Sequence, residues 1–144
     1  MALKDKRIVP GAKPDARIAT EIRARALDGT LSCAEAFAAA DRAGVSPLEV
    51  GRTADVLRIK LSHCQLGLFG YPGTKTGWNR SGGGLGTAPD GLEAAIKRRA
   101  GREAGIACSD LWDLAELYGI PRIQAGDVAD RMGIRIVACQ LGAF

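Results

Sequence analysis

The chain has 144 residues, of which 47% are hydrophobic and 25% are charged, and its formal net charge is +4. This composition is typical of a globular protein with an apolar core rather than of a disordered chain. No apolar run approaches the roughly 18 residues of a membrane span, and no apolar stretch follows the basic N-terminus as it would in a secretory signal. We therefore expect no membrane partner and a cytoplasmic location.

A basic arm opens the chain at residues 1–13, which we expect to be flexible. Its cations are Lys4, Lys6, Arg7 and Lys13. Flexible basic arms supply contacts to the phosphates or the minor groove of DNA. The alternative interpretation is that these residues only keep a disordered terminus soluble.

The first folded unit is expected at residues 14–69 and begins with helix signals. Pro14 and Asp15 precede apolar residues at helical spacing, which predicts a first helix. A short extended piece at residues 30–32 leads into a second helix, for which Ser32 and Glu35 form a capping-box pattern. Gly44 is expected to end that helix in a left-handed conformation.

A third helix is predicted directly after this turn. Ser46 is a suitable cap, Pro47 suits the first helical position, and Glu49 completes a capping box. The alternation of apolar and polar residues at 59–62 then predicts a strand, and residues 63–69 are expected to return as a hairpin.

A glycine-rich linker follows at residues 70–88, where seven of nineteen residues are glycine. Beyond it, residues 89–144 repeat residues 14–69 at an offset of 75, with sixteen of fifty-six positions identical. The predicted fold class is therefore mainly α with small β-hairpins (α+β), built by internal duplication of one unit. Gly51 and Gly126 recur inside the third helix of each unit, which indicates that the helix backbone packs closely against another element, either the preceding helix or a partner.

Both units end in the string CQLGxF, at residues 64–69 and 139–144. We expect this string to close the core of its own unit, with the leucine and phenylalanine pointing inward. Removal of residues 139–144 should then destabilise the second unit.

The order of elements, with AEAFAAADRAGVSPLEVGRTADVL followed by IKLSHCQLGLF, resembles the winged helix-turn-helix. Among such proteins it looks most like the DNA-binding domains of the molybdate-responsive ModE and the LysR-type regulators, although no effector domain follows. The resemblance implies a DNA-binding transcriptional regulator that reads double-stranded DNA with the third helix and the wing. It further implies a link to molybdate or related metabolism.

Carried over by this resemblance, the candidate DNA contacts are Arg52, Thr53, Lys60, Arg122, Gln124 and Arg131. The charge balance argues against this interpretation, because residues 46–57 sum to −1 and residues 121–132 sum to zero, whereas neutralised phosphates dominate DNA affinity. The alternative hypothesis is a winged-helix module that binds a protein partner or a second copy of itself.

Four cysteines, Cys33, Cys64, Cys108 and Cys139, are the remaining candidate site residues. Zinc sites use four ligands, commonly in close pairs such as C-x2-C, and no such pair exists here. We interpret the cysteines as buried thiols that pack like small apolar residues, with a shared four-cysteine metal site or redox sensing as alternatives. No catalytic constellation or cofactor fingerprint emerges, so we expect a protein that is not an enzyme and needs no cofactor.

Overall fold

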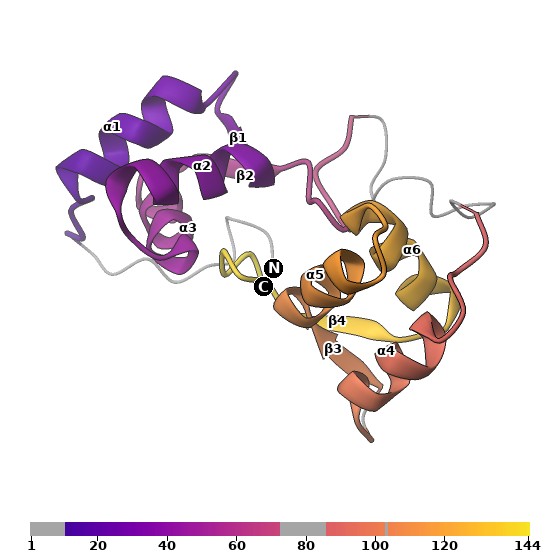
Figure 1. Cartoon of the computed structure of the whole chain (residues 1–144). Coiled ribbons are helices and arrows are strands. Elements are labelled where there is room, and N and C mark those ends of the chain that lie inside the picture. Colours follow the sequence, from indigo (N-terminus) through magenta and orange to yellow (C-terminus); the bar gives the residue numbers. More distant parts are fainter. Residues whose placement is uncertain (1–10, 73–85, 103) are drawn as a thin grey trace. The chain divides into compact units, whose positions relative to one another are not determined.

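The computed structural model describes residues 11–72, 86–102 and 104–144. Contacts divide the chain into two compact units. Unit 1 comprises Met1–Cys64 together with Gln140–Phe144, and unit 2 comprises Gln65–Cys139. The structure is mainly helical with small sheets, as predicted, and in its described residues each unit contains three helices and one pair of strands (Figure 1).

The elements of unit 1 follow the predicted order: α1 (Ala16–Arg25), β1 (Thr30–Ser32), α2 (Cys33–Ala43), α3 (Pro47–Val56) and β2 (Lys60–Ser62). Those of unit 2 repeat it: α4 (Leu92–Ala100), β3 (Gly105–Ala107), α5 (Cys108–Leu117), α6 (Arg122–Arg131) and β4 (Arg135–Ala138). Among the described residues, no helix is long and apolar enough to cross a membrane.

The helix starts of unit 1 use side-chain caps that the sequence predicts. The Asp15 carboxylate accepts hydrogen bonds from the first-turn amides of α1. Ser46 and Glu49 form the full capping box of α3. Ser32 caps α2, but the Glu35 carboxylate lies 2.8 Å from Arg25 Nη1, so only the serine half of that predicted box is present.

Unit 2 starts the same helices without side-chain caps. Gly91, Ala107 and Pro121 occupy the cap positions of α4, α5 and α6, and none of them has a side chain that bonds to the first turn. An N-cap serine or aspartate typically contributes about 1 kcal/mol over alanine. Packing rather than capping must therefore hold the helices of unit 2 in place.

The predicted hairpin is not formed in the part of the chain that the structure describes. The strand after the third helix of each unit pairs in parallel with the short strand before the second helix. Leu31 lies opposite Leu61 in unit 1, and Ile106 lies opposite Ile136 in unit 2. Parallel neighbours need a long crossover, and two helices supply it here. After β2 the backbone turns away through His63, whose φ is +47°, and no strand follows in described residues 63–72. The wing expected from the resemblance is not formed there.

The core of unit 1 lies between its helices and its sheet. Its fully buried members include Ile22, Leu31 and Val50, and alanines form the inner face of α2. The corresponding helix of unit 2 buries the larger Leu111 and Leu114. Phe37 and Trp112, which we expected on the inward faces, are only half-buried, because smaller neighbours fill those faces.

The segments that end each sequence repeat, Gln65–Phe69 and Gln140–Phe144, are here called the QLG segments. Each lies in the unit other than the one that precedes it in sequence. Leu141 is 1% exposed within unit 1, and Leu66 is 4% exposed within unit 2. The leucines are core residues as predicted, but the expectation that each closes its own repeat is wrong. Phe144 is 41% exposed and does not cap the core.

We predict that Leu141→Ala destabilises unit 1, although residue 141 directly follows unit 2 in sequence. Truncating a buried leucine costs about 2–5 kcal/mol. Hydrogen exchange followed by mass spectrometry should show faster exchange in α3 and unchanged exchange in α6. Leu66→Ala should produce the reverse pattern, and Phe144→Ala should have a smaller effect than Leu141→Ala. Faster exchange of α6 in Leu141→Ala would contradict the assignment of these segments.

Candidate functional site: the third helix of each unit

Each unit contains two consecutive helices joined by a short turn, the connection expected of the helix-turn-helix motif. Three residues separate α2 from α3, and four separate α5 from α6. Gly44 has φ +68° and Gly119 has φ +65°, the left-handed conformation that glycine adopts with little strain. The next amides, of Val45 and Ile120, donate to Ala40 and Ala115 carbonyls at 3.0 Å. This spacing and glycine position are typical of the motif.

The structure separates the three residues predicted for unit 1. Arg52 is exposed on α3, and Lys60 is exposed at the first position of β2. Thr53 instead is 7% exposed, and its hydroxyl donates to the Glu49 carbonyl at 2.8 Å. The expectation that Thr53 faces a ligand therefore fails, because the core-facing side of α3 includes position 53 as well as Val50 and Ala54.

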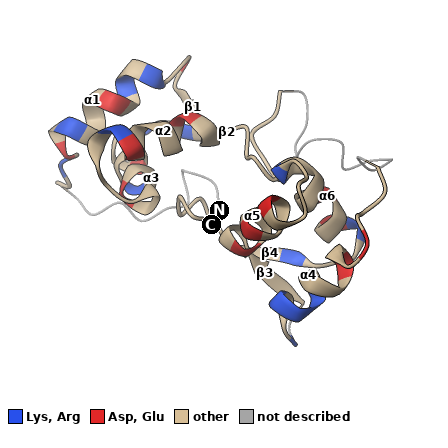
Figure 2. Cartoon of the chain, viewed as in Figure 1, with Lys and Arg blue, Asp and Glu red and all other residues tan. Residues whose placement is uncertain are grey.

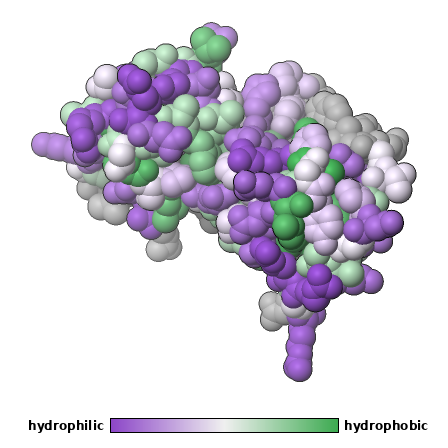
Figure 3. Space-filling view, in the orientation of Figure 1, coloured by the Kyte–Doolittle hydropathy of each residue, from purple (hydrophilic) through white to green (hydrophobic). Residues whose placement is uncertain are grey.

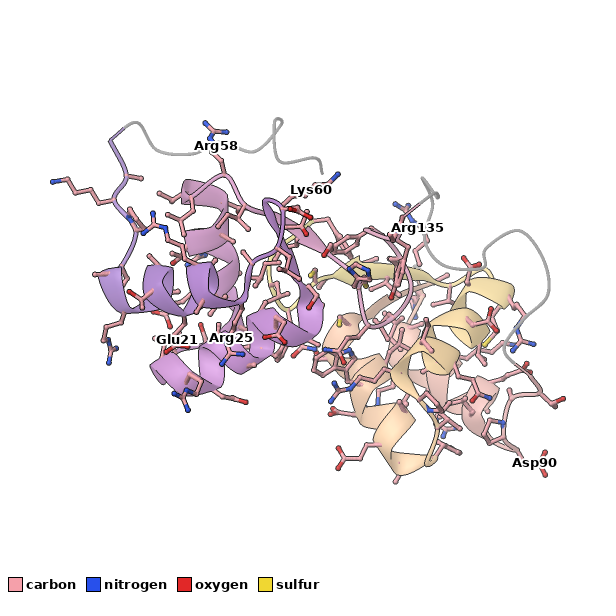
Figure 4. All side chains as sticks on the ribbon, turned by 90° about the horizontal axis from the view of Figure 1, so that it is seen from above. Glu21, Arg25, Arg58, Lys60, Asp90 and Arg135 are labelled. Atoms are coloured by element: carbon pink, nitrogen blue, oxygen red, sulfur yellow. The ribbon has the colours of Figure 1, made fainter. Side chains whose placement is uncertain are left out.

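Arg58 belongs with the exposed cations of unit 1, although the sequence analysis did not select it. It follows α3 directly and is exposed. Its φ of +58° turns the chain out of the helix, and its side chain extends outward from the ribbon, as does that of Lys60 (Figure 4). Within the described residues, the ion pairs of unit 1 involve Arg25 rather than these cations. The sequence signal for Arg58 was its position directly after the predicted third helix.

Arg122 of unit 2 is held between two side chains. Its guanidinium lies 3.6 Å from the centroid of the Trp112 ring, and its Nη1 donates to Gln65 Oε1 at 2.7 Å. Stacking on tryptophan is the most favourable cation–π geometry for arginine. Gln65 belongs to the QLG segment of this unit, so Arg122 ties that segment to α5 and α6. Sequence reasoning missed this cluster because its members lie far apart in the chain.

The other two predicted residues of α6 are also involved in local contacts. Arg131 Nε lies 3.0 Å from Asp127 Oδ2, and its Nη2 donates to the Gly86 carbonyl at 2.8 Å. Gln124 is half-buried, and its backbone N–H donates to the Pro121 carbonyl. The two arginines of α6 therefore already have partners within unit 2.

In the ribbon of Figure 2, basic and acidic residues are interspersed over the described helices of both units. The end of α4 has three adjacent cations, Lys97, Arg98 and Arg99, but Arg99 lies 3.3 Å from Asp110 on α5. The predicted arm residues Lys4, Lys6 and Arg7 lie outside the described residues. On α6, Arg131 is paired with an acid, Asp127, whereas Arg122 keeps its full charge because its partners Gln65 and Trp112 are uncharged.

The central glycine of each third helix faces the backbone of a QLG segment. A Cβ on Gly51 would overlap the Leu141 carbonyl group, and a Cβ on Gly126 would overlap that of Leu66. This contact explains why both sequence repeats have a glycine inside a helix, where it costs about 0.5–1 kcal/mol relative to alanine. We call the two surfaces, centred on Gly51 and Gly126, the QLG seats.

The leucine one turn before Gly51 extends the seat of unit 1. A Cβ built on Gly142 would lie 2.8 Å from Leu48 Cδ1, so the QLG segment passes closely over this side chain. Leu48 is still 37% exposed. The seat thus covers the face of α3 that includes Leu48 and Gly51 and leaves Arg52 accessible.

The cysteines all lie within the described residues, and none forms a disulfide. Cys33, Cys64 and Cys108 are buried, and Cys139 is half-buried. Burial of this kind fits thiols that pack as small apolar groups. Within the described part of the chain, no three histidine, cysteine, aspartate or glutamate side chains gather in a way that could hold a metal ion.

Apolar side chains on the surface are scattered. The face drawn in Figure 3 is mostly hydrophilic, with small separate hydrophobic groups. Among the described residues, the exposed large hydrophobic side chains are Leu27, Leu48, Leu117, Val137 and Phe144. Single exposed apolar residues are normal on soluble surfaces, so they do not by themselves mark an interface.

Comparison with known proteins adds no assignment: the chain matches no protein-family model, no curated protein and no solved structure.

We predict that Arg122→Ala loosens the QLG segment of unit 2. The substitution removes a cation–π contact worth about 0.5–1 kcal/mol and a hydrogen bond worth about 1 kcal/mol. The chain has two tryptophans, so the measurement uses a Trp78→Phe background in which the fluorescence comes from Trp112. In this background the emission of Trp112 should change, and the backbone amides of residues 65–70 should exchange faster. Arg98→Ala, which removes an exposed arginine from α4, is the matched control. Equal spectra and exchange for both variants would show that the cluster does not hold the segment.

Proposed function

We propose that this chain is a tandem helix-turn-helix protein that binds double-stranded DNA through α3 of unit 1. Its two sequence repeats, residues 14–69 and 89–144, are proposed to be duplicated copies of one module joined by residues 70–88. The observation that carries the proposal is the capped third helix, placed after a three-residue turn, together with three exposed cations on or just after it: Arg52, Arg58 and Lys60.

The roles of these cations follow from their positions. Arg52 projects from the exposed side of the third helix, the element that enters the major groove in helix-turn-helix proteins. Arginine at such a position bonds to the edge of guanine. Arg58 and Lys60 lie beyond the end of the helix, where they are suited to contact phosphates and set the orientation of the protein on the duplex.

Unit 2 has a different role in this proposal. Arg131 is paired with Asp127, and Arg122 is held in place by Gln65 and Trp112, so we assign the main DNA contacts to unit 1. Arg135, which lies opposite Gly105 in the sheet, is the exposed equivalent of Lys60. The resemblance to molybdate-responsive and LysR-type regulators supports transcription regulation as the setting of this DNA binding.

We predict weak, salt-dependent DNA binding that depends on unit 1. With about three neutralised phosphates, log K should fall with log salt at a slope of about −3. Fluorescence anisotropy with a labelled 30-base-pair duplex should show this slope. The triple variant Arg52→Ala, Arg58→Ala, Lys60→Ala should lose most of the affinity.

The matched control removes the same charge from α4 and the turn after it, through Lys97→Ala, Arg98→Ala and Arg102→Ala. Its affinity should stay within about threefold of the unmodified chain, because those cations lie on or just after the first helix of unit 2. If both triple variants weaken binding equally, the attraction is only general electrostatics. If the unmodified chain does not bind at 20 mM salt, the proposal is wrong.

A second candidate function is protein binding, and the QLG seats favour it. Each third helix already packs against a turn segment that is distant in sequence, with a buried leucine and a backbone passing over a glycine. Helices that accept a segment in this way are suited to accept a similar segment from another protein. We propose that such a partner presents the sequence Gln-Leu-Gly followed by an apolar residue.

We predict that a synthetic Gln-Leu-Gly-Ala-Phe peptide restores protection to α3 in the Leu141→Ala variant. One buried leucine contributes about 1.5–3 kcal/mol, which corresponds to a Kd of roughly 6–80 mM, so the peptide is used at about 20 mM. Hydrogen exchange in α3 should slow on peptide addition. A peptide with aspartate in place of leucine should have no effect. Identical exchange with and without the first peptide would exclude recognition of a free segment.

A further inference from the structure

The two QLG seats bind nearly identical ligands. The segments Gln65–Phe69 and Gln140–Phe144 differ only at one position, where the first has Leu68 and the second has Ala143. Both seats place a helical glycine against the backbone of the segment leucine. The contacts at a seat therefore do not identify which copy of the segment fills it.

The two units differ in how their segment is connected. Unit 2 is continuous, because Gln65–Phe69 leads along the chain into the rest of the unit, Gln65–Cys139. Unit 1 is discontinuous: Met1–Cys64 is completed by Gln140–Phe144, which arrives only after the whole of unit 2. Leu141 follows Gly51 by ninety residues (141 minus 51).

An identical segment from another molecule can make the same contacts as the chain's own. Exchange of an identical element between protomers is a low-cost route to a dimer, since it needs no new surface. When the chain's own segment fills the seat, it makes the same contacts, and its advantage is its effective concentration. This concentration is about millimolar for a short flexible linker and falls as the linker lengthens.

We propose that the seat on α3 of one copy binds the Gln140–Phe144 segment of a second copy, so that two chains form a dimer by reciprocal exchange of this segment. The dimer is completed by the contacts that complete unit 1 in a single chain: Leu141 in the core, its backbone over Gly51, and Gly142 over Leu48. This inference does not depend on DNA binding.

The test uses two full-length variants, each with one added cysteine at the seat. Leu48→Cys places a thiol on α3, and Gly142→Cys places one on the segment that passes over it, where a Cβ would lie 2.8 Å from Leu48 Cδ1, so the two thiols are neighbours when the seat is filled. One variant has an additional tag that makes it larger on a gel. The two are mixed at about 0.5 mM, incubated, and oxidised with oxidised glutathione.

The expected result is a mixed disulfide of tagged and untagged chains whose yield falls on dilution before oxidation. The chain with both cysteines is the positive control, since it should form the same bond whichever copy supplies the segment. Leu27→Cys mixed with Gly142→Cys is the matched negative control, because Leu27 is an exposed loop residue that is 76% accessible. The unmodified chains report any background from the four native cysteines.

A second measurement keeps the proposal falsifiable if the cysteine variants fold poorly. Light scattering on the unmodified chain should give a mass that rises toward twice that of the monomer between about 10 µM and 1 mM, the range in which exchange competes with internal closure. Gly51→Ala, which blocks the seat, should abolish the rise, and Arg52→Ala on the same helix should not. A chain that stays monomeric throughout, or a dimer unaffected by Gly51→Ala, would overturn the proposal.

Discussion

The close approach of a QLG segment to a helical glycine is the constraint on which each unit depends. A helix gains stability when glycine is replaced by alanine at an ordinary position, by about 0.5–1 kcal/mol. At Gly51 and Gly126 that gain is unavailable, because the leucine carbonyl group of the segment occupies the space of a Cβ. Burial of the segment leucine, worth about 1.5–3 kcal/mol, more than offsets the cost of the glycine. The third helix, the segment and the core therefore form together.

The same backbone is stabilised by different chemistry in the two units. Unit 1 caps α3 with Ser46 and Glu49, whereas α6 begins after Pro121 without a side-chain cap. Unit 2 instead uses the Arg122 guanidinium, which bonds to Gln65 and stacks on Trp112. Arg122, which anchors a segment in unit 2, is therefore engaged by Gln65 and Trp112, whereas the cations on and after α3 are exposed to solvent.

Electrostatics and packing point to two uses of the same helix. The side of α3 with Leu48 and Gly51 binds a segment of polypeptide, and the side with Arg52 is exposed to solvent. These sides do not compete for residues, so occupation of the seat and contact with a duplex are compatible. For the proposed contact with DNA, about three accessible cations would neutralise few phosphates, so we expect a modest affinity.

Local signals in the sequence determined the helices and their ends, because caps such as Asp15 and Ser46 and the left-handed Gly44 act within a few residues. The repeat at an offset of 75 likewise predicted two similar sets of elements. The parallel sheets, the burial of Thr53, and the Arg122 cluster depend on residues far apart in the chain. Only the tertiary structure decided where each CQLGxF string packs. Two nearly identical strings and two equivalent glycines allow either pairing, and their contacts alone do not distinguish a unit's own string from the other.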